Sequence, residues 1–182
     1  MFEGIHELLP GHFALFDREG FRERSYFELT AAPHAASYEE TVETLRELLL
    51  DTVHRQLAAD VPLCTFLSGG LDSSVVTAIA AGILKERGQR LSTYSFEFEG
   101  NEAYFTPSSF QPDRDQDWAE RVSRELGTDH HTLLCTNDQL ADSLFEAVIA
   151  KDLPGMADVD GSLLHFCRQV KQNHVVALCG EC

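Results

Sequence analysis

A short apolar run that ends in a glycine- and serine-rich turn constrains this chain more than any other feature. The run covers residues 63–67, the turn covers residues 68–74, and apolar residues at helical spacing begin at Val75. A strand that leads through such a turn into a helix brings unpaired N–H groups and the positive end of the helix dipole to one point. The sequence therefore predicts an anion-binding loop at the start of a helix.

The composition of this turn indicates a nucleotide phosphate with a bridging metal ion. Gly69 and Gly70 allow the backbone to approach a ligand closely. The hydroxyl donors of the turn are three serines, Ser68, Ser73 and Ser74. The turn contains no Lys or Arg and lacks the spacing of a Walker A loop. Asp72 stands where a phosphate would lie, which favours Mg²⁺ between its carboxylate and the phosphates.

Strand-like and helical patterns alternate along the chain. Strands are expected at residues 63–67, 91–98, 131–135 and 175–178, and helices at 42–57, 75–88, 118–127, 140–148 and 163–170. This alternation is typical of a doubly wound α/β fold with a mainly parallel sheet, which binds ligands at the carboxyl ends of its strands. Residues 68–74 and 179–181 both follow strands, so we expect both at that edge. The polar segment 100–115 is expected to form a long loop.

Composition narrows the class of protein. The chain has 182 residues, enough for one sizeable core, and a net charge of −16, which argues against nucleic-acid binding. It has neither a signal peptide nor a run of about 18 apolar residues, so we expect no membrane association and a cytoplasmic location. Its 5 cysteines, an odd number, indicate reduced thiols.

Five motifs occur in a fixed order along the chain. The first, residues 67–74, reads Leu-Ser-Gly-Gly-Leu-Asp-Ser-Ser. The others are residues 91–98, 126–131, 152–160 and 179–182, the last of which reads Cys-Gly-Glu-Cys. Together they resemble the glutamine-hydrolysing asparagine synthetases. The resemblance implies a sheet of the adenine nucleotide alpha hydrolase (ATP pyrophosphatase) type, which cleaves ATP to AMP and pyrophosphate.

The resemblance also implies an organisation in two parts. Residues 1–33 look like the end of a glutaminase domain, a class II amidotransferase, followed by a linker, and we expect a small β remnant there. Residues 34–182 look like the first part of the ATP-binding synthetase domain. We therefore expect an internal piece of a longer protein, inactive by itself.

The resemblance assigns roles to residues of this sequence. The phosphates of ATP are expected on five residues of the turn, Ser68, Gly69, Gly70, Ser73 and Ser74. Leu67 and Phe98 are expected to contact the adenosine, and Cys179 and Gly180 to contact the nucleotide from the second motif. Asp72 is expected to hold Mg²⁺. Glu181 is a candidate base for the amine step.

The implied reaction makes a carbon–nitrogen bond. The β-carboxylate of aspartate attacks the α-phosphorus of ATP, giving β-aspartyl-AMP and pyrophosphate, and ammonia released from glutamine displaces AMP to leave asparagine. Two alternatives stay open: an amidotransferase or cyclising synthetase on the same scaffold, such as a β-lactam synthetase, and a non-catalytic nucleotide-binding paralogue. The sequence leaves open which acyl substrate is used and whether the protein is a homodimer.

Three clusters of potential metal ligands receive a structural interpretation instead. His130 and His131 are adjacent, so on a strand they point to opposite faces. The acidic run at residues 113–117 lacks the Gly and Glu of an EF-hand loop and fits a solvated face or a helix N-terminus. Cys179 and Cys182 have no second pair at zinc spacing.

Overall fold

The computed structural model describes residues 3–108 and 113–180, without the side chains of Ala157 and Asp158. The chain divides into two compact units, Met1–Thr41 and Val42–Cys182. The domain division expected between residues 33 and 34 stays a prediction.

The first unit contains a β-hairpin. Strands β1 (His12–Asp17) and β2 (Gly20–Ser25) pair antiparallel and are joined by a two-residue turn. The Arg22 side chain bonds to the carboxylates of Asp17 and Glu19 across this turn. The small β element expected near the N-terminus is thereby confirmed.

The second unit is built on a four-stranded parallel sheet. Its strands are β3 (Leu63–Phe66), β4 (Ser92–Phe98), β5 (Asp129–Cys135) and β6 (Val176–Leu178). The strand order is β5-β4-β3-β6, and all three neighbouring pairs are parallel. The chain thus runs outward from β3 to β5 and then returns to the other side of β3. The order of strands reverses between β3 and β6, the place where open α/β sheets form their ligand crevice.

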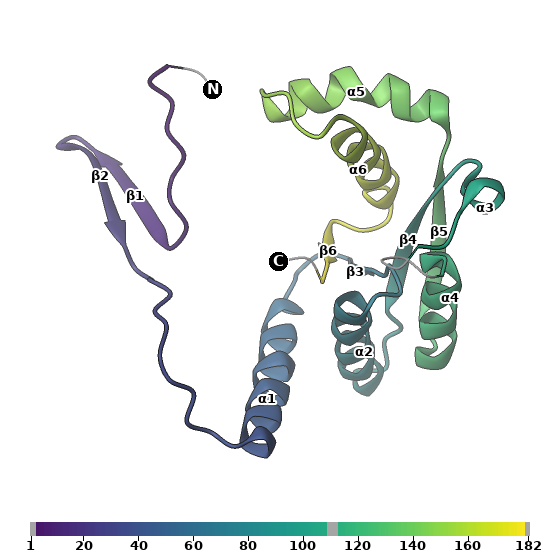
Figure 1. Cartoon of the computed structure of the whole chain (residues 1–182), viewed down its shortest axis with the longest axis horizontal. Coiled ribbons are helices and arrows are strands. Elements are labelled where there is room, and N and C mark those ends of the chain that lie inside the picture. Colours follow the sequence, from purple (N-terminus) through teal and green to yellow (C-terminus); the bar gives the residue numbers. More distant parts are fainter. Residues whose placement is uncertain (1–2, 109–112, 181–182) are drawn as a thin grey trace. The chain divides into compact units, whose positions relative to one another are not determined.

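Helices connect these strands and cover both faces of the sheet (Figure 1). Their bounds are α1 (Tyr38–Gln56), α2 (Leu71–Glu86), α3 (Asn101–Tyr104), α4 (Asp115–Leu126), α5 (Asn137–Lys151) and α6 (Ala157–Val170). On one face, Leu63 packs with Val53 of α1 and Ala80 of α2. On the other face, Cys64 packs with Val170 of α6. Adjacent residues of β3 therefore serve two separate cores, and the doubly wound α/β fold is confirmed.

The observed helices and strands differ from the expected ones where a regular backbone carries polar residues and so shows no apolar pattern. Helix α2 begins at Leu71 instead of Val75, because its first turn is polar although its backbone is already helical. Strand β5 begins at Asp129 instead of His131. The backbone of Asp129 pairs with Ser92 of β4, although the Asp129 side chain is exposed and polar. The loop expected at residues 100–115 contains the short helix α3.

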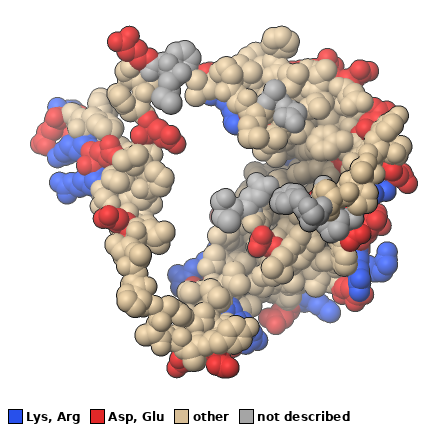
Figure 2. Space-filling model, viewed as in Figure 1, with Lys and Arg blue, Asp and Glu red and all other residues tan. Residues whose placement is uncertain are grey.

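Charged side chains are spread over the surface. On the face in Figure 2, Asp and Glu are interspersed with Lys and Arg. Within the described residues, none of the helices has both the length and the apolar character that crossing a membrane requires.

Candidate functional site

The turn after β3 is held in place by backbone and hydroxyl hydrogen bonds. Leu67 is buried, and its N–H donates to the carbonyl oxygen of Tyr94 on β4 at 2.8 Å. The Ser68 and Ser73 hydroxyl oxygens are 2.9 Å apart, and the N–H of Ser68 donates to the Ser73 hydroxyl at 3.2 Å. The N–H of Gly70 donates to the Ser68 hydroxyl at 3.3 Å. These bonds close the turn over the start of α2.

The N-terminus of α2 presents free backbone donors at this turn. Gly70 occupies the N-cap position with an extended backbone and without a side-chain cap. The N–H of Ser74 donates to the carbonyl of Gly70 at 3.1 Å and closes the first turn. The N–H groups of Leu71, Asp72 and Ser73 precede this bond, so they have no acceptor within the helix. The predicted anion site therefore has its donors, supplied by the backbone of α2.

Gly69 lies too close to α4 for any other residue. Its φ of +86° belongs to the left-handed region, which favours glycine. A Cβ at this position would lie 2.6 Å from the Cβ of Trp118, 2.7 Å from the nitrogen of Ala119 and 2.8 Å from the oxygen of Asp115. The first turn of α4 thus forms a wall against the loop. Sequence reasoning missed this contact, because Trp118 read only as part of an apolar helix face.

The second motif meets the first at the crevice between β3 and β6. Leu178, the last residue of β6, pairs with Thr65 of β3. Two residues later, a Cβ on Gly180 would lie 2.5 Å from the nitrogen of Ser73 and 2.7 Å from the carbonyl carbon of Asp72. Segments more than a hundred residues apart in the sequence therefore touch at the N-terminus of α2, at the sheet edge where we expected both.

Phe98, which was expected to contact the adenosine, lies farther along the sheet. Phe98 lies four residues beyond Tyr94, the β4 partner of Phe66, so it extends about 13 Å past that point of the sheet. Its ring packs edge-on against Phe166 of α6, at 5.8 Å between centroids. Glu181 lies outside the described residues. The roles of Phe98 and Glu181 stay predictions.

Asp72 is available for a metal ion. In the part of the chain that the structure describes, its carboxylate is exposed and has no hydrogen-bond or ion-pair partner. The described residues contain no group of three or more His, Cys, Asp or Glu side chains arranged around a metal. Mg²⁺ commonly binds through one or two carboxylates together with substrate phosphates. Asp72 beside the free N–H groups of α2 fits that mode of binding.

Ser74 faces a different environment from the other serines. Its hydroxyl is buried and has no hydrogen-bond partner among the residues that the structure describes. The residue lines a mostly apolar groove of about 360 Å³ between α2 and α4, together with Val75 and Trp118. Its expected contact with phosphate stays a prediction.

The potential metal ligands set aside above have partners inside the fold. The His130 ring nitrogens lie 2.8 Å from the Thr93 hydroxyl and 3.2 Å from the Ser95 hydroxyl, whereas the ring of His131 stacks on Tyr94 at 5.0 Å. The two rings thus occupy opposite faces, as expected, and burial lowers the pKa of His130.

The acidic run at residues 113–117 and the cysteine pair are the other two clusters of potential metal ligands. Asp115 and Asp117 lie in the first turn of α4, which confirms the helix N-terminus. Cys179 is exposed beside Gly180, and Cys182 lies outside the described residues.

Comparison with known proteins identifies the family to which this arrangement belongs. The family model described as "Asparagine synthase" matches residues 44–182. The chain belongs to the asparagine synthase family.

Individual relatives cover different shares of this family member. The chain is 49% identical over 183 residues to the glutamine-hydrolyzing asparagine synthetase 3 of Bacillus subtilis (strain 168), which covers 100% of this chain and 30% of that protein. It is 34% identical over 169 residues to the amidase chyE of Penicillium rubens, covering 88% of this chain and 25% of that protein. Among solved structures, the NAD+ synthetase of Burkholderia pseudomallei aligns with a TM-score of 0.39 and 17% identity, over 78% of this chain and 62% of that one. The chain spans less than a third of the length of the curated relatives it matches.

Proposed function

We propose that the protein is an ATP-dependent ligase that makes asparagine from aspartate, with glutamine as the amido donor. ATP is cleaved to AMP and pyrophosphate through a β-aspartyl-AMP intermediate. In this proposal, residues 1–33 end a glutaminase domain that supplies ammonia. Residues 34–182 begin the ATP-binding domain, and the protein acts in the cytoplasm. Membership of the asparagine synthase family supports the proposal.

One structural observation carries the proposal. Gly180 of the second motif lies against Asp72 and Ser73 of the first, at the point where the order of strands reverses. A bound nucleotide at this crevice meets the N-terminus of α2 from one segment and the loop after β6 from the other. The arrangement suits ATP because free N–H groups and a helix dipole favour the phosphates.

The residues of the chain supply positioning and charge stabilisation in this reaction. The N–H groups at the start of α2 donate to the phosphates, and the left-handed backbone at Gly69 lets the loop approach them. Buried Leu67 and the end of β4 near Phe98 bound the adenosine side, and the exposed Cys179 bounds the other. The α-phosphorus is thereby fixed for in-line attack by the aspartate carboxylate, and such positioning accounts for much of the expected rate enhancement.

Asp72 holds Mg²⁺ in this proposal, and the metal ion neutralises charge on the phosphates when bound. Glu181 is proposed as the base that removes a proton from the attacking amine.

A second candidate is an amide-forming ligase that uses a different carboxylate. The 34% identity to a relative named an amidase favours keeping it open, because a chain this similar carries a different activity name. Aspartate-dependent release of pyrophosphate separates the two candidates. A protein that releases pyrophosphate with another carboxylic acid, but not with aspartate, would support the second.

The test uses a complete protein that contains this chain, and it measures the products of ATP cleavage. We expect AMP and pyrophosphate in the presence of aspartate, and ADP with phosphate would contradict the proposal. Asp72→Asn should lower aspartate-dependent pyrophosphate release by at least about a hundredfold while circular dichroism stays unchanged.

The matched control for this substitution is Asp138→Asn. Asp138 is an exposed acidic residue in the first turn of another helix, α5, away from the two motifs. The Asp138→Asn variant should release pyrophosphate as fast as the wild type does. Undiminished turnover in Asp72→Asn would show that this carboxylate does not organise the metal ion.

A further inference from the structure

Polar contacts hold the first turn of helix α4 to the sheet. The fully buried residues of the helix are the small Ala119 and Ser123, and Leu126 at its far end packs against the apolar core. The Ser123 hydroxyl lies 2.7 Å from that of Thr128. Because this apolar packing lies at the far end, hydrogen bonds position the first turn, and each bond has a direction and a defined length.

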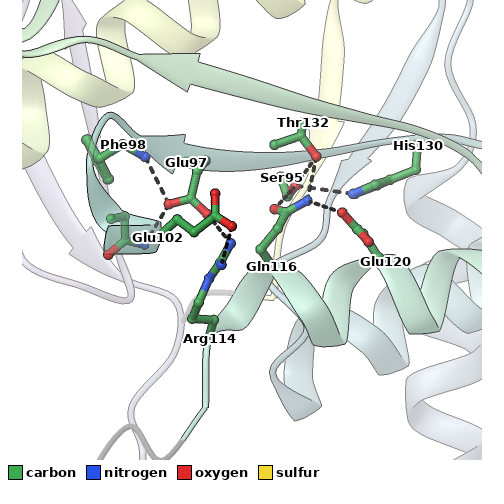
Figure 3. Close-up of polar contacts among 10 residues, drawn as sticks. Ser95, Glu97, Phe98, Glu102, Arg114, Gln116, Glu120, His130 and Thr132 are labelled. Atoms are coloured by element: carbon green, nitrogen blue, oxygen red, sulfur yellow. Dashed lines mark hydrogen bonds and ion pairs between the residues drawn. The ribbon is translucent and has the colours of Figure 1, made fainter. Parts of the chain in front are cut away.

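Gln116 makes the central contacts of this interface, as Figure 3 shows. Its Oε1 accepts from the hydroxyl of Ser95 on β4 at 2.8 Å. Its Nε2 donates to the hydroxyl of Thr132 on β5 at 2.5 Å and to the carboxylate of Glu120 at 3.2 Å. One side chain in the first turn of α4 therefore bonds to two strands.

A second contact holds the same end of the helix. Arg114, the N-cap residue of α4, lies 3.6 Å from the carboxylate of Glu97 near the carboxyl end of β4 (Figure 3). That carboxylate also accepts from the N–H of Phe98 at 3.1 Å and the side-chain amide of Asn101 at 2.6 Å. The start of α4 is thus tied to the sheet at two neighbouring residues.

The anchored turn is the same turn that touches the phosphate loop. Asp115, Trp118 and Ala119 supply the atoms that leave no room for a Cβ on Gly69. Gln116 stands directly after Asp115, so a shift of this turn moves the wall against which Gly69 rests. Nucleotide affinity depends on loop geometry to within fractions of an ångström.

We infer that Gln116 is a positioning residue for the nucleotide: it fixes the first turn of α4, and this turn sets the phosphate loop at Gly69. The inference rests on the proposed function, since it assumes that the loop binds ATP. Gln116 itself does not touch the nucleotide.

The test measures the dissociation constant of Mg·ATP for a complete protein that contains this chain, and the tryptophan fluorescence of the 182-residue chain. Trp118 is the only tryptophan, and its Cβ lies against Gly69, so its fluorescence reports on the loop. Gln116→Ala should weaken binding about tenfold and change the emission of Trp118 without nucleotide, because the turn is released. The control Gln172→Ala removes an exposed glutamine in the turn after α6 and should bind as the wild type does.

A conservative variant separates positioning from general stability. Gln116→Glu keeps the acceptor for Ser95 but loses the donor to Thr132 and places a carboxylate beside Glu120. The half-buried His130 is the other titratable group of the cluster. At pH 8 it should bind Mg·ATP about tenfold more weakly than the wild type. As the pH is lowered toward the ordinary glutamate pKa of about 4.3, the new carboxyl group takes up a proton and can donate again, so the ratio of the two dissociation constants should move toward one.

A double variant tests whether the two sides of the contact act together. Gly69→Ala disturbs the same contact from the loop, so Gly69→Ala combined with Gln116→Ala should lose little more affinity than the weaker-binding single variant.

Several outcomes would overturn the inference. Folded Gln116→Ala and Gln116→Glu proteins with wild-type affinity at pH 8, or fully additive losses with Gly69→Ala, would show that the turn does not set the loop. Loss of folding in both variants would show that Gln116 holds the fold and not the loop. A wild-type complete protein that fails to bind Mg·ATP would instead contradict the proposed function.

Discussion

Replacing Gly180 by Ala tests the contact between the two motifs directly. Gly180 has no positive φ, so alanine is allowed by the backbone and the effect is steric alone. The new Cβ would lie 2.5 Å from the nitrogen of Ser73, whereas ordinary contacts begin at 3.4 Å. The loop after β6 must therefore move away from α2 by about 0.9 Å, the difference between those two distances.

A displacement of this size should affect binding far more than stability. Misplacing a binding group by about 1 Å can cost on the order of a hundredfold, so we expect Mg·ATP affinity to fall by about that factor. Overpacking costs about 1–3 kcal/mol in a tight core, but Gly180 is only half-buried and its loop can yield. Removing a glycine also stabilises by about 0.4–1 kcal/mol through the unfolded chain. The free energy of unfolding should therefore drop by no more than about 2 kcal/mol.

Isothermal titration calorimetry with Mg·ATP and urea unfolding together check this prediction. Gly82→Ala is the matched control, because a Cβ there meets nothing within 4 Å and the residue lies inside α2. It should keep the affinity of the wild type and raise stability by about 0.5–1 kcal/mol. A Gly180→Ala protein that binds within about twofold of the wild type would refute the reasoning, since the two motifs would then not need to touch.

Three further predictions concern thiols, pH and a helix cap. Burial raises the pKa of Cys64 to about 12, so iodoacetamide at pH 8 should leave Cys64 unmodified while it labels the exposed Cys179. Mg·ATP should protect Cys179 from this labelling. Mass spectrometry of the peptides checks both results. Burial lowers the pKa of His130 and His174, so the unfolded chain binds protons more readily than the folded chain. The free energy of unfolding should therefore stay constant above about pH 6.5 and fall as the pH drops below that value. In urea titrations from about pH 5 to 8, His130→Gln should make this fall smaller. The Thr136 hydroxyl caps α5 by accepting from the third helical N–H at 3.2 Å, so Thr136→Ala should cost about 1 kcal/mol of stability, and an unchanged urea midpoint would contradict the capping role.

Local patterns predicted most of the elements, because each depends on residues close together in the sequence. The apolar spacing that ends at Gly127 predicted α4, and Gly127 adopts the left-handed conformation that ends this helix. Ser-x-x-Glu is the local sequence pattern of a capping box, and at Ser37 and Glu40 the N–H of each residue donates to the side chain of the other. Where polar side chains occupy a regular backbone, as at Asp72 and Ser73 in the first turn of α2, the pattern placed the start of the helix too late.

The candidate site also has features that depend on neighbouring residues in the sequence and features that depend on tertiary packing. The sequence alone predicted a turn that leads from a strand into a helix N-terminus, because glycines and serines between a strand and a helix are a local signal. It also implied that both motifs lie at the carboxyl edge of a parallel sheet. Only the tertiary structure decided that β6 pairs with β3, which brings Gly180 against Ser73 across more than a hundred residues. It alone decided that Gly69 rests on Trp118, because the contact depends on how α4 packs and leaves no periodic trace in the sequence. Local chemistry thus determined what each segment can bind, and the order of strands determined which segments bind together.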